Sequence, residues 1–313
     1  MAAVLNTNAA SLYASKNLQA AQSKMANSVE RLSSGLRINR AKDDAAGLGI
    51  ANALTQQING ANQGVRNLND GISMVQTAEG AIAAAQEMAQ RILTLATQGS
   101  NGTLGSTERT AIQSEMRQLI ISINAIGGRT KFSGNSLLAQ PTTGGTPTGF
   151  TLQVSNNTTD TITLAAGAFY DIGVGLESGT AASEADIKAN SLTFSAGQAS
   201  ALIQAINHAD MQSGVSGTAI PKFNLVQSAA ADYITALSTQ RSLLGAYQGQ
   251  IEFTVSNVTE LSSNLAAARS NVQDTDYASE TASLTKGQIL QQAATAMLAQ
   301  ANQMPNVILS LLK

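Results

Sequence analysis

The feature that most constrains this fold is a heptad pattern of apolar residues in the last third of the chain. Apolar side chains recur there at alternating three- and four-residue steps, which places them on one face of a helix. Spacing sustained over this length predicts a coiled coil or a bundle of long helices. Gln240 and Thr254 occupy the two polar positions of the stripe. Its apolar members are Val226, Ala230, Tyr233, Leu237, Leu244, Tyr247, Ile251, Val258, Leu261, Leu265, Ala268 and Val272.

The first part of the chain, from about 1 to 128, shows the same helical spacing. A long segment from Leu54 to Ala96 carries a stripe that only Glu79 and Gln86 interrupt. An earlier helix is expected on the pattern of Leu18, Met25, Val29, Leu32 and Leu36. Both stripes are amphipathic and predict helices that pack against other helices.

A third helix is expected to begin near residue 106. Ser106 is the predicted cap, Glu108 supplies an acidic first turn, and Gly127-Gly128 is the predicted stop. At the other end of the chain, Pro305 is expected to interrupt the last helix before an apolar tail, 307–312. That last helix is predicted from Ile289, Ala293, Met297, Ala301 and Met304.

The middle of the chain has a different pattern. Residues 141–147 form a Pro- and Gly-rich turn cluster. Two alternating segments, 150–154 and 161–164, flank a polar turn and predict a β-hairpin. A short helix is expected near 196–209. The predicted fold class is therefore mainly α, with long antiparallel helices from both termini forming a coiled coil or bundle and a small hairpin-containing middle segment.

The terminal helices lack enough partners within the chain to cover their apolar faces. The helices near 18–36 and 289–304 can cover each other along one seam, but a two-helix pair leaves apolar side chains exposed, and such surfaces usually mark interaction sites. An ordinary bundle with a third helix inside the chain is the alternative. We expect both ends to be disordered in the monomer and to fold on assembly. The expected self-assembly residues are Leu18, Met25, Val29, Leu32, Leu36, Ile289, Ala293, Met297, Ala301, Met304, Leu311 and Leu312.

Composition excludes several classes of protein. The formal net charge of −2 leaves no basic surplus to neutralise phosphates, so we expect no nucleic-acid partner. The chain has no Cys, which excludes disulfides and thiolate metal sites. No apolar run is long enough for a transmembrane helix, and no membrane partner is expected. The start lacks the features of a cleaved signal peptide, so the cytoplasm is the default location on these grounds alone.

The sequence contains no convincing catalytic or ligand-binding motif. His208 is the single histidine and has no second ligand to complete a zinc site. Asp43-Asp44 is the one tempting carboxylate pair, but acids before Ala-Ala-Gly are more typical of a helix start. The stretch from Gly99 to Gly105 lacks a P-loop lysine and predicts a turn between helices. We therefore expect no catalytic, cofactor-binding or metal-binding residues, and not an enzyme.

Specific strings at both ends resemble the bacterial flagellin family, the subunits of the flagellar filament. The amino-terminal strings are residues 30–39 (ERLSSGLRIN), 41–47 (AKDDAAG), 69–73 (NDGIS) and 76–81 (QTAEGA). The carboxy-terminal strings lie at 241–246, 267–270, 274–278, 288–292, 296–303 and 309–312. The resemblance covers about 1–140 and 224–313, and Gly249-Gln250 departs from the Asn-Arg that the family usually shows there.

The resemblance implies a domain organisation and a route of export. Residues 1–42 and 273–313 would form an inner coiled-coil domain, and residues 43–180 and 222–272 a helical bundle with a hairpin. Residues 181–221 would be a short variable outer segment. The subunit would be exported unfolded through the flagellar type III apparatus and would build an extracellular filament for motility. Implied partners are other copies of the chain, a flagellar export chaperone, and the filament cap and hook-junction proteins.

The resemblance also implies recognition by the innate receptor Toll-like receptor 5. Arg91, Leu95 and Glu115 match the family's contact positions, whereas Leu93-Thr94 replace the usual Arg-Glu. We expect weakened recognition because two charges are lost. In the alternative interpretation, Arg91 and Glu115 face solvent or pack between subunits.

Two other functions compete with a filament subunit. A hook–filament junction protein has flagellin-like ends, but it does not usually match the flagellin carboxy-terminal strings this completely. A non-flagellar coiled-coil adaptor has no evident reason to end on the apolar tail 307–312.

Overall fold

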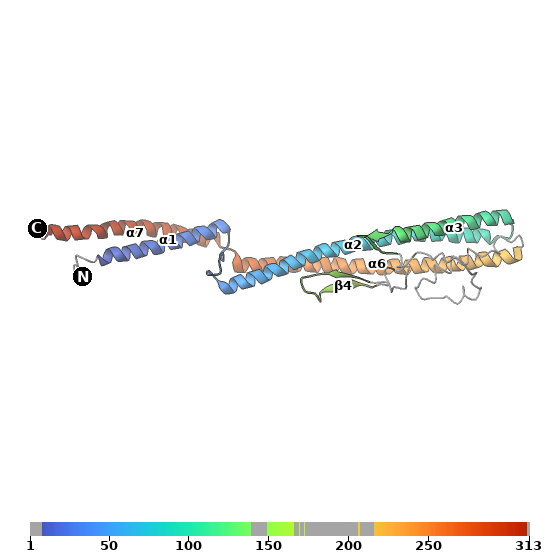
Figure 1. Ribbon diagram of the computed structural model, residues 1–313, viewed down its shortest axis with the longest axis horizontal. Coiled ribbons are helices and arrows are strands. Elements are labelled where there is room, and N and C mark those ends of the chain that lie inside the picture. The colour runs from blue at the N-terminus through green and yellow to red at the C-terminus, as the bar shows by residue number, and fades with distance from the viewer. Residues whose placement is uncertain are drawn as a thin grey trace. The chain divides into compact units, whose positions relative to one another are not determined.

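The computed structural model describes residues 8–138, 149–165, 169, 172, 206 and 216–311. Its helices are α1 (Ala9–Ser34), α2 (Ala45–Gly99), α3 (Ser106–Arg129), α6 (Ser216–Gln273) and α7 (Tyr277–Leu311) (Figure 1). The strands are β1 (Lys131–Phe132), β2 (Asn135–Ser136), β3 (Phe150–Gln153) and β4 (Thr161–Leu164). The predicted fold class, mainly α with long terminal helices and a small hairpin, is confirmed.

The chain divides into two compact units. One comprises Met1–Asn59 and Ser262–Lys313, and the other comprises Gly60–Leu261. The first contains α1 and α7, which pack against each other. The second contains most of α2 and α6, together with α3 and the strands.

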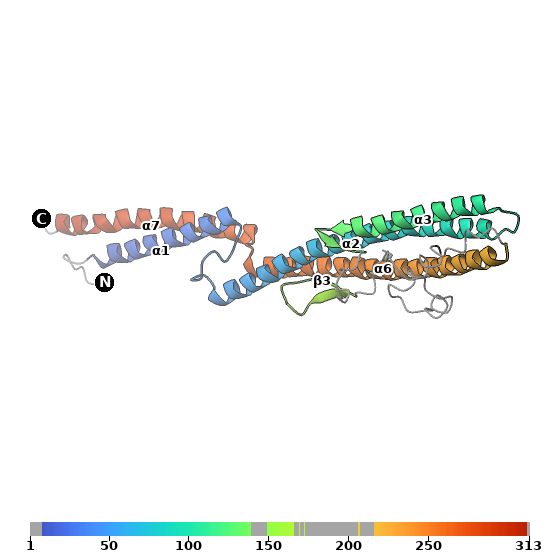
Figure 2. The ribbon, with the colours of Figure 1, turned by 45° about the vertical axis from the view of Figure 1, so that its right-hand side comes forward.

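The core of the second unit lies between α2, α3 and α6, which run side by side (Figures 1 and 2). Most of the predicted α2 and α6 stripes between residues 61 and 258 are buried. The two polar exceptions on α2 are accounted for by one side chain of α6. The guanidinium of Arg241 donates to Gln86 Oε1 at 3.1 Å and to Glu79 Oε1 at 3.4 Å. The largest fully buried apolar side chains of the three helices include Leu68, Ile82, Ile92, Leu95, Met116, Ile123 and Phe223.

Helix α3 begins and ends slightly differently from the sequence prediction. Gly105 is the N-cap and makes no side-chain hydrogen bond, so the prediction of Ser106 as the cap was wrong. Glu108 lies in the first turn as expected, where its charge complements the helix dipole. The helix continues through the Gly127-Gly128 pair to Arg129 because Gly destabilises a helix by only about 1 kcal/mol.

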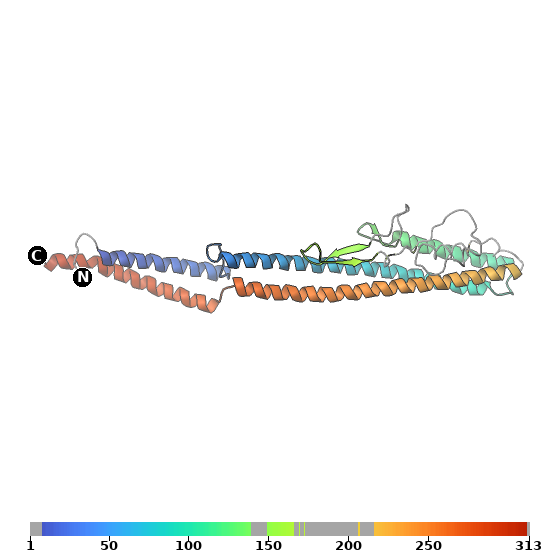
Figure 3. The same ribbon diagram turned by 90° about the horizontal axis from the view of Figure 1, so that it is seen from below.

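The predicted hairpin is present and packs against α2 (Figure 3). Strands β3 and β4 pair antiparallel, with Phe150 opposite Leu164 and Gln153 opposite Thr161. Asn67 Nδ2 of α2 donates to the Gln153 carbonyl at 2.9 Å.

Glycines of α2 allow this close approach of strand and helix. A Cβ added at Gly64 would lie 1.6 Å from the Val154 carbonyl oxygen, and one added at Gly71 would lie 2.3 Å from Leu152 Cδ1. The hairpin backbone therefore occupies space that any other side chain at Gly64 would fill.

A second, smaller hairpin joins β1 to β2. Ser133 and Gly134 form its turn, with φ of 50° and 86°. Positive φ at both central residues is typical of the type I′ turn, which favours glycine.

Some sequence predictions lie outside the described residues. These are the turn cluster 141–147, the expected helix 196–209 except residue 206, and His208. Most of the variable segment 181–221 also lies outside, although its residues 216–221 belong to α6. Among the described residues, no helix combines the length and hydropathy needed to span a membrane.

Candidate functional site: the terminal helix pair

Helix α1 is defined by a cap at each end. Asn8 is the N-cap, and its Oδ1 accepts a hydrogen bond from Ser11 N at 3.1 Å. Gly35 ends the helix in the left-handed conformation with φ 72°, and its N–H donates to the Arg31 carbonyl. Leu36 therefore lies beyond the helix, where it forms a bridge with Asp274, and its predicted place on the helical stripe was wrong.

Backbone hydrogen bonds beyond α1 fix the antiparallel start of α7. Arg37 N donates to the Gln273 carbonyl at 2.7 Å, and Thr275 N donates to the Gly35 carbonyl at 3.0 Å. The Arg37 guanidinium adds a bond of 2.6 Å to the Val272 carbonyl. These bonds place the C-terminal end of α1 beside the N-terminal end of α7.

Small residues form the centre of the seam between α1 and α7. On α1, Ala14, Ala21 and Ser28 are buried, one heptad apart. On α7, Gly287, Ala294 and Ala301 are buried at the same spacing. Small side chains at heptad spacing let two helix backbones approach closely over several turns.

Larger apolar side chains flank the small ones on each helix. Leu18, Met25 and Leu32 on α1, and Leu284 and Leu298 on α7, are half-buried beside the seam. Three predicted residues of the α1 stripe therefore do lie at the contact. The exception within the helix is Val29, which is 51% exposed.

The predicted α7 stripe does not form this seam. Ile289 is 61% exposed and Met297 is 64% exposed, and Ala293 is exposed as well. Ala301 is the member of the stripe that is buried. The small residues Gly287 and Ala294 face α1 because they permit the closest packing, which turns the larger residues to one flank.

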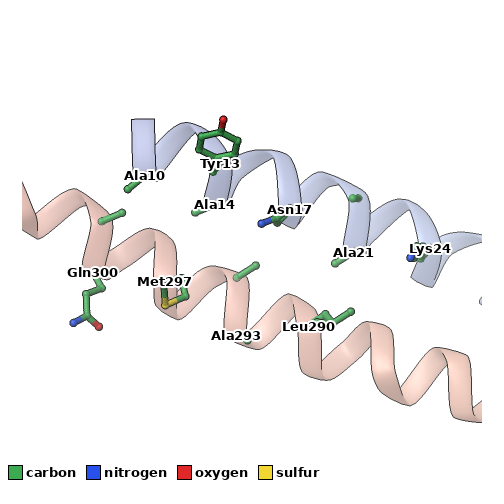
Figure 4. A pocket seen from close by; sticks show the side chains of 13 residues that line it. Ala10, Tyr13, Ala14, Asn17, Ala21, Lys24, Leu290, Ala293, Met297 and Gln300 are labelled. Atoms are coloured by element: carbon green, nitrogen blue, oxygen red, sulfur yellow. The ribbon is translucent and has the colours of Figure 1, made fainter. Parts of the chain in front are cut away.

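Ala293 and Met297 of this flank, together with α1, line a shallow groove of about 610 Å³ (Figure 4). Ala14 and Ala21 point from α1 toward α7 along its floor, and Tyr13 lies at its outer edge, 70% exposed. Its polar rim consists of Asn17, Lys24 and Gln300. The apolar members of the lining are Ala10, Tyr13, Ala14, Ala20, Ala21, Leu290, Ala293, Ala294, Met297 and Ala301.

Helix α7 continues through Pro305 to Leu311, so the predicted interruption was wrong. Proline has no N–H, and in a helix this leaves the carbonyl of the residue four positions earlier without its usual donor. That carbonyl belongs to Ala301, and it accepts a hydrogen bond of 2.7 Å from Asn8 Nδ2. The N-cap of α1 therefore replaces the bond that Pro305 removes.

Three predicted assembly residues lie partly or wholly outside the described part of the chain. The side chains of Met304 and Leu311 and the whole of Leu312 lie outside the described residues. Residues 304 and 311 belong to α7 by backbone conformation.

The predicted receptor-contact residues lie in the second unit. Arg91 on α2 and Glu115 on α3 form an ion pair of 2.7 Å, with side chains 53% and 46% exposed. Leu95 is 1% exposed and belongs to the hydrophobic core. The two charges are thus accessible at the surface, whereas Leu95 contributes to packing.

The carboxylates of Asp43 and Asp44 organise the turn before α2. Asp44 Oδ1 accepts from Gly47 N at 2.8 Å, as expected for a helix-start acid. Asp43 Oδ2 accepts from Arg40 N at 3.0 Å and from Asn39 N at 3.3 Å. The bond from Arg40 is the main reason that the pKa of Asp43 is lowered. Among the described residues, no group of acidic or histidine side chains could hold a metal ion.

Comparison with known proteins identifies the two helical ends. The family model for the bacterial flagellin N-terminal helical region matches residues 5–143, and that for the C-terminal helical region matches residues 228–312. Polar flagellin F of Vibrio parahaemolyticus is 35% identical, with 100% of each chain covered. Flagellin of Bacillus subtilis is 36% identical, with 99% of each covered. A solved structure described as a flagellar hook-associated protein of Vibrio parahaemolyticus matches with a TM-score of 0.53 at 13% identity, covering 74% of this chain and all of that one, and shows a shared fold.

Proposed function

Because the chain belongs to the bacterial flagellin family, we propose that it polymerises with copies of itself through the apolar flank of its terminal helix pair. A flagellin is the subunit of the extracellular flagellar filament, and this chain is such a subunit. The observation that supports this use of the flank is the exposure of Ile289 and Met297, of which Met297 lines the apolar groove. A soluble monomer gains nothing from leaving such large apolar side chains in water.

The burial of these side chains favours assembly by an appreciable free energy. Fully burying a side chain of the size of Ile or Met contributes about 1.5–3 kcal/mol. Leu12, Tyr13 and Leu290 are also exposed, by 72%, 70% and 43%. Contacts repeated at every subunit along a filament would multiply this contribution.

We further propose that the two ends fold on assembly after export of the unfolded chain. The seam supports this proposal because it buries mainly Ala, Ser and Gly, which supply little apolar area. A helix pair with so small a core is marginal in water and needs neighbours for stability. The partners that we propose are an export chaperone, the filament cap and the hook-junction proteins.

We propose the domain boundaries that the resemblance to the flagellin family implies. Residues 1–42 and 273–313 form the inner domain, residues 43–180 and 222–272 form the next shell, and residues 181–221 form a short outer segment. The breaks between α1 and α2 and between α6 and α7 support the inner boundary.

The proposed role is structural and not enzymatic, as family membership suggests. A hook–filament junction function is less well supported, because the hook-associated structure described above is 13% identical and shares the fold alone. The two flagellins described above are 35% and 36% identical over almost the whole chain.

We propose weakened recognition by Toll-like receptor 5 through Arg91 and Glu115. Both charges are exposed but already paired with each other, and Leu95 is buried. A receptor-reporter assay should show a weak response to the monomer that falls further when Arg91 is replaced by Ala. A monomer of full potency would contradict this proposal.

Deletion of residues 290–313 tests the assembly function. The truncated chain should fail to extend filament seeds, because α7 loses Ala293, Ala294 and Met297. Circular dichroism should show that the helices of residues 43–272 remain folded. Growth of normal filaments from the truncated chain would overturn the proposal.

A further inference from the structure

The sequence contains two Asn-Gly dipeptides, Asn59-Gly60 and Asn101-Gly102. An asparagine before glycine is chemically labile, because the glycine nitrogen can attack the side-chain amide and glycine has no Cβ to hinder the attack. The two dipeptides differ in structure: the first lies within α2, and the second lies in the turn between α2 and α3. They therefore form an internal comparison within one chain.

Asn101 is exposed, and its side-chain oxygen accepts one hydrogen bond within the turn. Its Oδ1 accepts a hydrogen bond from Thr103 N at 3.2 Å. Within the described residues, the Gly102 N–H donates no hydrogen bond, so this nitrogen is free to lose its proton and act as nucleophile. A backbone N–H aimed at the oxygen where negative charge develops stabilises a tetrahedral intermediate.

Asn59 lacks these features because it lies inside a long helix. Helical backbone pairs the N–H of Gly60 with the carbonyl four residues earlier. The same backbone holds that nitrogen away from the Asn59 amide carbon, so attack requires local unfolding of α2.

We propose that Asn101 is a site of spontaneous deamidation that changes the charge of the α2–α3 turn. The deprotonated Gly102 nitrogen bonds to Asn101 Cγ, and the resulting oxyanion at Oδ1 accepts the Thr103 N–H. Solvent, which took the proton of Gly102 N, returns one to Nδ2, and collapse of the intermediate then breaks the Cγ–Nδ2 bond, releases ammonia and leaves a cyclic imide. Water then opens the imide at either carbonyl, which gives aspartate or isoaspartate. The net reaction consumes one water and releases one ammonia, with no oxidant or reductant.

A buried arginine favours the isoaspartate product. Arg109 of α3 is 1% exposed, and its Nη2 donates to the Asn101 backbone carbonyl oxygen at 3.4 Å. In isoaspartate, this oxygen becomes part of a free carboxylate. The neutral acceptor beside the guanidinium is thereby replaced by an anion, and hydrogen bonds between charged partners are stronger than neutral ones. Each event also makes the net charge of the subunit more negative by one.

The test is to incubate the purified chain at mildly alkaline pH and map its peptides by mass spectrometry. The readouts are the mass gain of replacing an amide NH2 by OH and enzymatic methylation of isoaspartate. The same incubation in concentrated urea gives the rates of both dipeptides in an unfolded chain. In the folded chain, Asn101 should react at least about tenfold faster than Asn59, a difference typical of a better-aligned reacting geometry. The folded chain should also keep Asn101 at or above its unfolded rate.

Variants of the turn separate the proposal from general instability. Gly102→Ala should slow the reaction at Asn101 strongly while leaving that at Asn59 unchanged. Gly102 is not at positive φ, so alanine there adds no strain from a left-handed backbone. Asn101→Asp supplies the charged reference for chromatography. Equal protection of Asn101 and Asn59 in the folded chain would overturn the proposal, as would an undiminished rate in Gly102→Ala.

Discussion

The packing of the hairpin on α2 predicts that alanine at Gly64 destabilises the protein, whereas alanine at Gly80 stabilises it. Gly64→Ala and Gly80→Ala each place a methyl group in the middle of the same helix. Replacing glycine by alanine in a helix interior stabilises it by about 1 kcal/mol. At Gly80 nothing lies within 4 Å of the added Cβ, so this gain should appear in full.

At Gly64 the same substitution should lower the stability of the protein. The added Cβ would lie 1.6 Å from the Val154 carbonyl oxygen, which is backbone and cannot rotate away. Overpacking of this kind costs about 1–3 kcal/mol. Displacement of the strand also breaks the bond between Asn67 and Gln153, worth about 0.5–1.5 kcal/mol. After the gain in helix propensity, Gly64→Ala should destabilise the protein by about 0.5–3.5 kcal/mol.

Urea unfolding of the monomer, followed by circular dichroism, measures both variants on the same scale. Gly71→Ala is a useful intermediate, because its Cβ would meet the movable tip of Leu152 at 2.3 Å. The expected order of stability is Gly80→Ala, then Gly71→Ala, then Gly64→Ala. If Gly64→Ala raised the stability as much as Gly80→Ala, the close approach of hairpin and helix would be refuted.

Two further predictions concern the first unit. The fold lowers the pKa of Asp43 and so favours its ionised form. The ionised carboxylate stabilises the turn above the ordinary pKa of 3.8, and this stabilisation is lost as the pH falls through the lower pKa of the folded state. An acid titration followed at the Arg40 amide resonance should detect the loss. Asn8→Ala should destabilise the helix pair by about 1–2 kcal/mol, from the lost cap and the lost bond to the Ala301 carbonyl. Asn8→Ala should therefore lower the melting temperature of the filament. It should lower it less in a Pro305→Ala background, because the Ala301 carbonyl then accepts a hydrogen bond from the N–H of residue 305. An equal loss in both backgrounds would argue against the replacement of that helical bond by Asn8.

The long helices were predictable because their stripes consist of large apolar residues with a clear period. Leu68, Ile82 and Leu244 are buried as the spacing indicates. The charged interruption at Glu79 was also compatible with a helix, although its partner Arg241 could not be identified from spacing alone.

The terminal seam was harder to predict, because it depends on small residues. Gly287 and Ala294 contribute little to an apolar pattern, yet they decide which face of α7 meets α1. The more obvious stripe of Ile289 and Met297 lies on the flank instead. A local pattern reports which residues are apolar, whereas the seam is chosen by how closely two backbones can approach. Similarly, the continuation of α7 through Pro305 depends on a hydrogen bond from Asn8, near the other end of the sequence. The residues around Pro305 give no sign of this donor.

Seeded filament growth of Met297→Asp, compared with that of Gln292→Asp, shows whether the apolar flank is the assembly surface. Both residues are exposed on α7, and both variants add one negative charge within the same helix. Met297 lines the apolar groove, whereas Gln292 is not part of its lining. Burying an unpaired carboxylate is strongly unfavourable, whereas an exposed one is tolerated.

Growth can be followed by light scattering and electron microscopy from seeds of the unmodified chain. Circular dichroism of the monomers should be the same for both variants, because neither residue is in the core. Met297→Asp should fail to extend the seeds, and Gln292→Asp should extend them at the normal rate. Normal growth of Met297→Asp would show that the apolar flank of the terminal helix pair is not the assembly surface.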